Sequence, residues 1–333
     1  MAYQILGKDV SKIGFGMMSL TQEGTKTQST DDEKFAILKA ALAAGSNSWN
    51  GGEFYGPNLE DNSLPVLRKY FEKYPEDAGK VCINIKGGAH KPPMTVDNSP
   101  EYVRQSVQHC VDQLGGKAKI DMWEMCRRVS QGEYLESLRV IDGFVKEGTI
   151  GGVALTEVNA NTIRQAAKIV KVAAVEVEIS LFETEPLHNG ICEACVELGI
   201  PIYAYSPLGR GFLTGKPFNP LFKMLPRLAD DNIAANTKLV EAVKKWAAKK
   251  DCTPAQFAIN WVATLSQRPG MPKIIPIPGA AHIDRVKENL REVELTDADM
   301  DEVDAFLVEF KPAGERLPAF FAQWLDTNES TEV

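Results

Sequence analysis

The chain has 333 residues, 44% hydrophobic and 25% charged, which are ordinary values for a globular protein with a substantial core. Its formal net charge of −8 disfavours nonspecific binding to nucleic acid or an anionic membrane, and no apolar run approaches the ~20 residues that span a bilayer. Six cysteines are too few for a disulfide framework and residues 1–7 lack a secretion-signal pattern, so we expect a cytoplasmic protein, with the nucleus as a second location.

Short apolar segments alternate with helical patterns along the chain. Residues 5–10 come first and read as a two-stranded hairpin able to plug the bottom of a barrel. The expected strands that follow are Ile13–Met18, Ser46–Trp49, Val81–Ile85, Ile120–Met125, Gly152–Thr156, Ala174–Ile179, Pro201–Ser206 and Lys273–Ile277. The expected helices are Asp31–Leu42, Asn62–Lys73, Pro100–Leu114, Tyr134–Lys146, Ala160–Val170, His188–Leu198, Thr237–Lys249, Thr253–Leu265, His282–Glu292 and Glu294–Phe310, followed by a tail to Val333.

Continuous apolar strands separated by helices favour a parallel sheet covered by helices. Eight such repeats close most naturally into an α/β fold of the (β/α)8 (TIM) barrel type, with an N-terminal hairpin and a C-terminal helix and tail. No long polar linker divides the chain, so we expect residues 1–333 to form one domain. No strand is followed by Gly-x-Gly-x-x-Gly, and a bound nucleotide is therefore held in another way.

Candidate functional side chains follow the ends of three expected strands, where such a barrel places its active site. Asn50 follows the second strand, Lys86 the third and Cys126 the fourth, and Tyr55 lies five residues beyond Asn50. A phenol with a pKa of roughly 10 is a poor acid near neutrality. A lysine ammonium ~4 Å away contributes on the order of 4 kcal/mol, enough to lower that pKa by up to ~3 units. We therefore expect Lys86 to make Tyr55 a usable proton donor.

The segment 50–56, Asn-Gly-Gly-Glu-Phe-Tyr-Gly, resembles the Asp-Thr-Ala-x-x-Tyr-Gly segment of the aldo-keto reductase superfamily. The chain looks like this superfamily along nearly its whole length and is most similar to the pyridoxal reductases of yeasts. The resemblance implies NADPH-dependent reduction of a small aromatic aldehyde, pyridoxal first, with Tyr55 as proton donor. A general aryl-aldehyde reductase and a nucleotide-binding regulatory subunit, similar to the potassium-channel β subunits, remain alternatives. Oligomeric state stays open.

Three further segments resemble the cofactor-binding parts of the superfamily. Tyr205 would stack on the nicotinamide, and the loop after it would cover the pyrophosphate. Arg285 would stack on adenine and Asn289 would hydrogen-bond to it. Because Gly279-Ala280 replaces the usual Lys-Ser, contact with a 2′-phosphate would depend on His282, Arg285 and backbone N–H groups. The full set implied by the resemblance is Thr156, Glu157 and Glu176 at the carboxamide, with Tyr205, Ser206, Pro207, Leu208, Gly209, Arg210, Gly279, His282, Arg285, Glu288 and Asn289.

Two positions depart from the superfamily pattern. Asn50 stands where an aspartate usually pairs with the lysine, and an amide can accept a hydrogen bond from an ammonium but cannot neutralise it. Cys126 stands where a histidine usually orients the carbonyl, and it is either a weak replacement or a buried thiol without catalytic duty. Glu124 shares a strand face with Cys126. We hypothesise that Glu124 points into the barrel and supplies the missing carboxylate.

Metal chemistry is not expected. The histidines show no metal-ligand spacing. Cys192-x-x-Cys195 lies in an expected helix without a second pair, which favours two buried thiols over a zinc or redox site.

Overall fold

A computed structural model describes residues 3–22, 29–91, 93–322 and 326. Eight parallel strands form one sheet in the order β12-β11-β10-β9-β8-β5-β4-β3. Gly14 and Gly16 donate their backbone N–H groups to the carbonyl oxygens of Pro276 (2.9 Å) and Pro278 (3.1 Å), which join the first strand to the last. The expected (β/α)8 barrel is confirmed, although part of the expected C-terminal tail lies outside the described residues.

Each expected strand overlaps an observed one. The second strand runs to Gly52, three residues further than expected, because Gly51 and Gly52 keep pairing with Ile85 and Lys86. Glycine fits there, since a Cβ at Gly51 would lie 2.9 Å from the Ser63 Cβ. The barrel strands are β3 (Phe15–Gly16), β4 (Ser48–Gly52), β5 (Cys82–Gly87), β8 (Met122–Met125), β9 (Gly152–Thr156), β10 (Val172–Glu178), β11 (Ile202–Tyr205) and β12 (Ile274–Pro276), and a short hairpin adds β6 (Ala89–His90) and β7 (Thr95–Val96).

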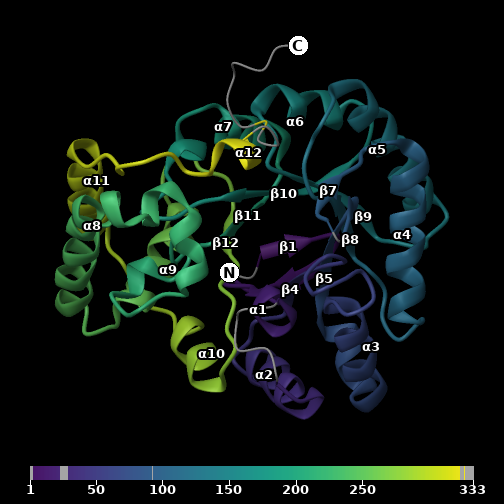
Figure 1. Cartoon of the computed structure of the whole chain (residues 1–333), viewed down its shortest axis with the longest axis horizontal. Helices are drawn as coiled ribbons and strands as arrows, with labels where there is room; N and C mark the ends of the chain where they lie inside the picture. The colour runs from purple at the N-terminus through teal and green to yellow at the C-terminus, as the bar shows by residue number, and fades with distance from the viewer. Residues whose placement is uncertain (1–2, 23–28, 92, 323–325, 327–333) are drawn as a thin grey trace.

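Helices surround the sheet on all sides, as Figure 1 shows. Thr30, Thr253 and Thr296 cap α2, α9 and α11 with complete capping boxes. The α-helices are α1 (Met18–Thr21), α2 (Asp31–Ala43), α3 (Ser63–Lys73), α4 (Pro100–Leu114), α5 (Gln131–Lys146), α6 (Ala160–Ala167), α7 (Ile191–Leu198), α8 (Asp230–Lys249), α9 (Pro254–Leu265), α10 (Ile283–Asn289), α11 (Asp297–Glu309) and α12 (Ala319–Ala322). Short 3-10 helices span Pro75–Lys80, Glu185–Leu187, Phe212–Thr214, Pro220–Met224 and Pro226–Leu228.

The N-terminal hairpin closes one end of the barrel. Its strands β1 (Tyr3–Ile5) and β2 (Lys8–Val10) pair antiparallel and lie over the centre of the sheet in Figure 1. Ile5 and Val10 are buried against the inward side chains of Met122, Tyr203 and Ile275. The expected plug is therefore confirmed.

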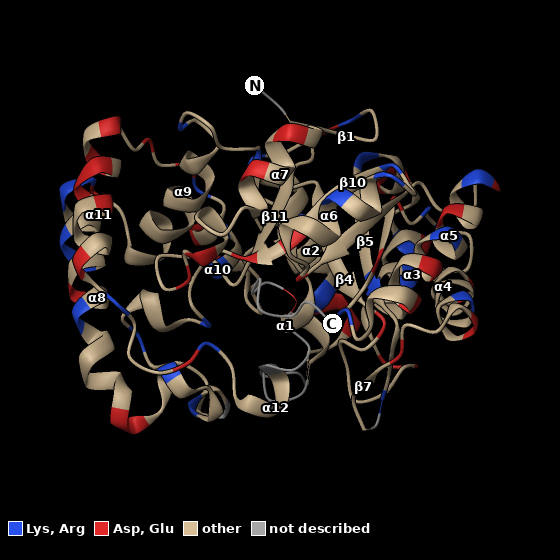
Figure 2. Cartoon of the chain, turned by 90° about the horizontal axis from the view of Figure 1, so that it is seen from above, with Lys and Arg blue, Asp and Glu red and all other residues tan. Residues whose placement is uncertain are grey.

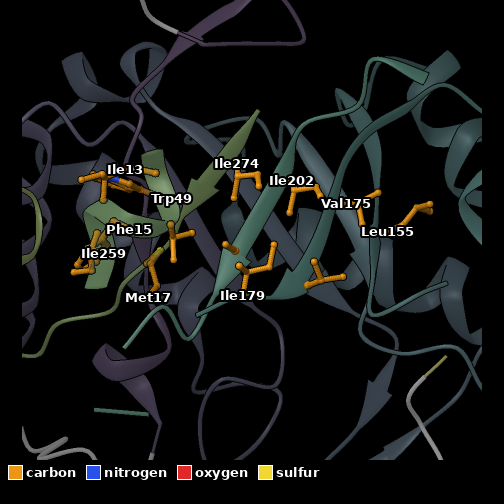
Figure 3. Close-up of a cluster of buried hydrophobic side chains, with 14 of the residues drawn as sticks. Ile13, Phe15, Met17, Trp49, Leu155, Val175, Ile179, Ile202, Ile259 and Ile274 are labelled. Carbon is orange, nitrogen blue, oxygen red and sulfur yellow. The ribbon is translucent and has the colours of Figure 1, made fainter. Parts of the chain in front are cut away.

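The two faces of the sheet carry different side chains. A row from adjacent strands, Ile274, Ile202, Val175 and Leu155, belongs to the large apolar cluster between sheet and helices (Figure 3). The inward face is apolar only next to the hairpin. Further toward the carboxyl ends of the strands it becomes polar and charged, and buried charges need partners there.

The outer helices carry many of the charged residues. Acidic and basic residues gather on α8 and α11 in Figure 2, where Lys249 binds Glu302 at 2.6 Å and Lys250 binds Asp299 at 2.8 Å. Among the described helices, none combines the length and the apolar composition that a membrane crossing requires.

Candidate active site

Four buried polar side chains meet inside the barrel, each from a different strand. Lys86 on β5 and Glu124 on β8 are direct register partners, and the Lys86 Nζ donates a hydrogen bond to the Glu124 Oε1. The same Nζ donates to the Oε1 of Glu176 on β10 at 2.7 Å. Asn50 on β4 donates from its Nδ2 to the Glu176 Oε2 at 2.5 Å. None of the four is more than 3% exposed, and we call them the Lys86 cluster.

The predicted orientation of Glu124 is confirmed. Its carboxyl group lies inside the barrel on Lys86, and Asn84 also donates to its Oε1 at 3.1 Å. Two other features differ from expectation. Glu176, expected at the nicotinamide carboxamide, instead binds Lys86, and Asn50 donates to Glu176 rather than accepting from Lys86. Ala154 is the register partner of Glu124 on β9, and Glu176 lies on β10, the next strand of the sheet.

The charges of the cluster are set by burial and by the two carboxyl groups. Burial lowers the pKa of Lys86, but Glu124 and Glu176 outweigh it and leave that pKa above its ordinary value. Burial and the nearby Glu124 raise the pKa of Glu176 to about 8. Near neutrality Lys86 therefore stays charged, and Glu176 holds a proton that relieves repulsion between the two carboxyl groups.

Tyr55 lies half-buried on the loop after β4, with its ring edge-on to Phe54 at 5.2 Å between centroids. Burial raises the pKa of Tyr55 to about 12, Lys86 lowers it only in part, and Glu176 and Glu124 raise it further. The expectation that Lys86 makes Tyr55 more acidic than a free phenol is therefore wrong for the protein without ligand, because burial of the phenol outweighs the effect of the lysine's charge. Tyr55 remains protonated at neutral pH and can still donate its proton.

Cys126 follows β8 and is 1% exposed, packed with Phe54 and Ala89. Its thiol donates to the carbonyl oxygen of Gly88 at 3.8 Å, and burial raises its pKa to about 11. Of the two expectations for this residue, the contacts favour a buried neutral thiol.

A second buried ionic cluster lies at the ends of β9, β10 and β11, and sequence reasoning missed its central residue. Arg316, from the C-terminal segment, donates from Nη2 to the Glu157 Oε1 and to the Tyr205 hydroxyl, both at 2.8 Å. Its Nε donates to the Glu178 Oε2 at 3.0 Å. Burial raises the pKa of Glu157, but Arg316 and Arg127 outweigh it and bring that pKa down to about 2. We call Arg316, Glu157, Glu178 and Tyr205 the Arg316 cluster.

Two buried polar atoms beside this cluster have no partner among the described residues, namely the Oγ1 of Thr156 and the Oε2 of Glu157. Thr156 is the last residue of β9, and Glu157 follows it and accepts a hydrogen bond from Arg316, which also donates to the Tyr205 hydroxyl. Unpaired buried polar atoms are costly, so this edge of the barrel fits a polar ligand with a flat ring, as a nicotinamide has.

The loop after Tyr205 has a backbone suited to an anion. Ser206, Gly209, Arg210 and Gly211 have positive φ angles of 51°, 54°, 58° and 91°. Left-handed residues in succession turn neighbouring N–H groups toward one side and form anion-binding concavities. Pro207 and Leu208 complete the expected segment, which fits a pyrophosphate.

The expected adenosine end lies where the barrel closes. A Cβ at Gly279 would lie 3.0 Å from the carbonyl oxygen of Gly16, which explains glycine at a position where a longer residue was expected. Asn289 on α10 donates to the Gly279 carbonyl oxygen at 3.3 Å. Arg285, with a side chain 43% exposed, pairs with Glu288 at 2.5 Å, and His282 precedes the same helix at its N-cap position without a side-chain capping hydrogen bond. His282 is exposed and Arg285 partly exposed, whereas Asn289 is buried.

Within the described ranges, no group of three or more His, Cys, Asp or Glu side chains is arranged to hold a metal ion. Cys192 and Cys195 lie buried and reduced in α7, as expected.

Comparison with known proteins gives consistent results. The model of the Aldo/keto reductase family matches residues 12–308. A Schizosaccharomyces pombe protein is 37% identical over 296 residues, covering 85% of this chain and 87% of the relative, and a Saccharomyces cerevisiae protein is 36% identical over 330 residues, covering 91% and 94%. Both relatives carry provisional names as pyridoxal reductases.

Solved structures resemble the fold at lower identity. A glycerol dehydrogenase from Gluconobacter oxydans superposes with a TM-score of 0.78 at 20% identity, covering 94% of this chain and 97% of its own. An aldo-keto reductase from Bacillus halodurans in its holo form gives 0.71 at 18% identity, with coverage of 94% and 97%.

Proposed function

The chain belongs to the aldo/keto reductase family, and we propose that it reduces small aromatic aldehydes, with pyridoxal as the preferred substrate and NADPH as the cofactor. The observation that carries this proposal is a buried lysine, held charged by Glu124 and hydrogen-bonded to Glu176, beside a protonated tyrosine at the carboxyl end of the barrel. Pyridoxal is preferred because the two yeast relatives carry that name. We expect the enzyme to act in the cytoplasm.

Each group in the site has a role in this reaction. The bound nicotinamide supplies the hydride. Tyr205 offers the ring that orients it, and the unpaired Thr156 Oγ1 and Glu157 Oε2 offer contacts to its carboxamide. Tyr55 gives its proton to the substrate oxygen, and Lys86 then faces the phenolate that remains. Lys86 adds little to the acidity of Tyr55 before the reaction. In the transition state, however, negative charge develops on the Tyr55 oxygen, and the positive charge of Lys86 stabilises it.

The preference for NADPH rests on the adenosine end. Arg285, His282 and the backbone near Gly279 would supply contacts for a 2′-phosphate. Lys216 lies 4.0 Å from Glu288 and adds a further cation near α10. Positive charge at this exposed edge favours binding of NADPH over NADH, because NADPH carries an additional phosphate group.

Initial rates with NADPH and with NADH test the function directly. Pyridoxal, 4-nitrobenzaldehyde and a blank without aldehyde are compared by loss of the reduced nicotinamide absorbance. Turnover of pyridoxal with NADPH, at a higher kcat/KM than 4-nitrobenzaldehyde, is the expected result. Tight nucleotide binding without turnover of either aldehyde would instead support a regulatory subunit, and absence of nucleotide binding would support a scaffold.

Tyr55→Phe tests the proton donor. We expect turnover to fall at least ~100-fold because general acid catalysis is lost, with nucleotide affinity nearly unchanged. Tyr74→Phe, at the end of α3 and away from the site, is the matched control and should keep wild-type rates. Undiminished turnover by Tyr55→Phe would remove Tyr55 from the mechanism.

A further inference from the structure

The proposed reaction requires a second contact to the carbonyl group of the substrate, in addition to Tyr55. A carbonyl that accepts a hydride must be held in place, and a single hydrogen bond from Tyr55 lets it rotate about that bond. Cys126 cannot provide a second hydrogen bond in its observed orientation, because its thiol donates to the Gly88 carbonyl oxygen. A second donor must come from another side chain at the mouth of the barrel.

Arg127, the residue after Cys126, has donors to spare. Its carbonyl oxygen is held by the Nδ2 of Asn98 at 2.9 Å, so its backbone is fixed. Its Nη1 donates to the Cys126 carbonyl oxygen at 2.5 Å. A guanidinium has five N–H groups, and within the described ranges Arg127 uses no other and forms no ion pair.

Neighbouring arginines differ in this respect. Arg128 forms an ion pair with Asp326, Arg316 with Glu157 and Glu178, and Arg210 lies 3.6 Å from Glu178. Arg127 is half-buried without a carboxylate partner among the described residues. A half-buried unpaired cation is costly to maintain, and an anionic ligand would offset that cost.

Arg127 also lies at the centre of the site. It follows Cys126 directly after β8, at the same carboxyl edge of the sheet where β4 leads to Tyr55 and β11 ends at Tyr205. It therefore lies at the edge of the barrel that carries the proton donor and the ring proposed to orient the nicotinamide, which is where the aldehyde must lie.

We propose that Arg127 binds the substrate and selects aromatic aldehydes that carry an ionised hydroxyl group next to the formyl group. One N–H of the planar guanidinium donates to the carbonyl oxygen and a second to the neighbouring phenolate oxygen. The formyl group and the hydroxyl group are attached to adjacent ring atoms, and their two oxygens lie in the plane of the ring. This arrangement suits the two parallel N–H groups of an arginine. Pyridoxal has this pair of groups. The inference rests on the proposed function and adds the substrate class.

Substrate pairs that differ only in the hydroxyl group test this selection. 3-Hydroxypyridine-4-carbaldehyde is compared with pyridine-4-carbaldehyde, and 2-hydroxy-5-nitrobenzaldehyde, whose hydroxyl group is ionised at neutral pH, with 3-nitrobenzaldehyde, in wild type, Arg127→Met and Arg127→Lys. We expect Arg127→Met to lower kcat/KM about 100-fold for the hydroxylated aldehydes and about 10-fold for the others, because two charge-assisted hydrogen bonds are lost in the first case and one in the second. Arg127→Lys should fall between, since an ammonium lacks the fork. Arg139→Met, exposed on α5, is the matched control.

A binding measurement separates this inference from the proposed function. Calorimetry with 2-hydroxybenzoate, in the presence of NADP⁺, should give at least 10-fold weaker binding to Arg127→Met than to wild type, with Arg127→Lys as the second variant if the methionine variant does not fold. Equal binding, or equal losses of kcat/KM within each substrate pair, would overturn the inference even if pyridoxal is turned over. If 2-hydroxybenzoate binds more weakly to Arg127→Met as predicted, but no aldehyde is turned over, the result would support the anion site and contradict the proposed reductase activity.

Discussion

The Lys86 cluster and the Arg316 cluster are both buried groups of opposite charges at the carboxyl ends of the strands, yet they are built differently. Lys86, Glu124, Glu176 and Asn50 all lie on barrel strands, and Lys86 and Glu124 are register partners in the sheet. Arg316 comes from the C-terminal segment and joins residues at least 111 positions earlier in the chain. The first cluster is fixed by the hydrogen bonds of the sheet. The second depends on where the C-terminal segment lies.

We expect the two clusters to affect different steps, namely the chemical step and nucleotide binding. The Lys86 cluster sets the charge that faces Tyr55 and cannot change without disturbing the barrel. The Arg316 cluster contacts Tyr205 and Glu157, which we propose as nicotinamide contacts, so the C-terminal segment is coupled to nucleotide binding. Asp326 holds the same segment through Arg128 and Thr162. The substitutions below should separate chemistry from nucleotide affinity.

Lys86→Met should have the largest effect. It leaves two carboxyl groups buried without their cation, which costs about 3–5 kcal/mol of unfolding free energy and abolishes turnover. The cost should be greater at pH 8 than at pH 5, because Glu176, whose pKa is raised to about 8, is neutral at the lower pH. Urea denaturation at the two pH values measures it. Lys146→Met, at a side chain 78% exposed, should change stability by less than ~0.5 kcal/mol; equal costs at the two positions would contradict the account.

Compared with Lys86→Met, Arg316→Met should lower the free energy of unfolding less and weaken nucleotide binding more. We expect a loss of about 2–4 kcal/mol, since Glu157 and Glu178 lose a buried partner but the segment can move and admit water. The nucleotide Kd, followed by fluorescence quenching, should rise about 10-fold while turnover at saturation falls less than 3-fold. Arg164→Met breaks an exposed Arg–Glu pair as control. An unchanged Kd would separate the C-terminal segment from the nucleotide site.

Glu176→Gln should have the mildest effect, seen in pH dependence. The pKa of Glu176 is raised to about 8, so the folded protein binds its proton more tightly than the unfolded chain does. This carboxyl group therefore favours folding below its unfolded pKa of about 4.3 and loses that contribution, by up to about 1.4 kcal/mol per pH unit, as pH rises toward 8. Relative to wild type, Glu176→Gln should gain stability between pH 5 and pH 8 in urea denaturation. A constant difference would show that Glu176 does not titrate in this range.

The sequence predicted the barrel because apolar runs of strand length alternate with capped helices, and both signals are local. It predicted the contact between Glu124 and Lys86 because side chains alternate along a strand, so a carboxylate two residues before Cys126 had to share its face. Glu176 on β10 reaches Lys86 on β5 although β9 and β8 lie between these two strands in the sheet. Predicting such a contact requires the register of four strands at once.

Other features had no local signal. Arg316 stands alone in a segment without periodicity, and its partners come from three strands. The pKa of Tyr55 was predicted in the wrong direction because a pairwise argument included Lys86 but omitted burial and the second carboxyl group. A charge balance inside a barrel depends on all inward residues together.

The most direct test of the central claim, that Glu124 replaces the carboxylate missing at position 50, is the turnover of Glu124→Gln alone and combined with Asn50→Asp. We predict that Glu124→Gln lowers kcat at least ~50-fold, because Lys86 loses the carboxylate that keeps it charged. Adding Asn50→Asp to this variant should raise kcat at least 10-fold above that of Glu124→Gln alone. Wild-type kcat in Glu124→Gln, or no recovery in the double variant while nucleotide still binds, would contradict the account.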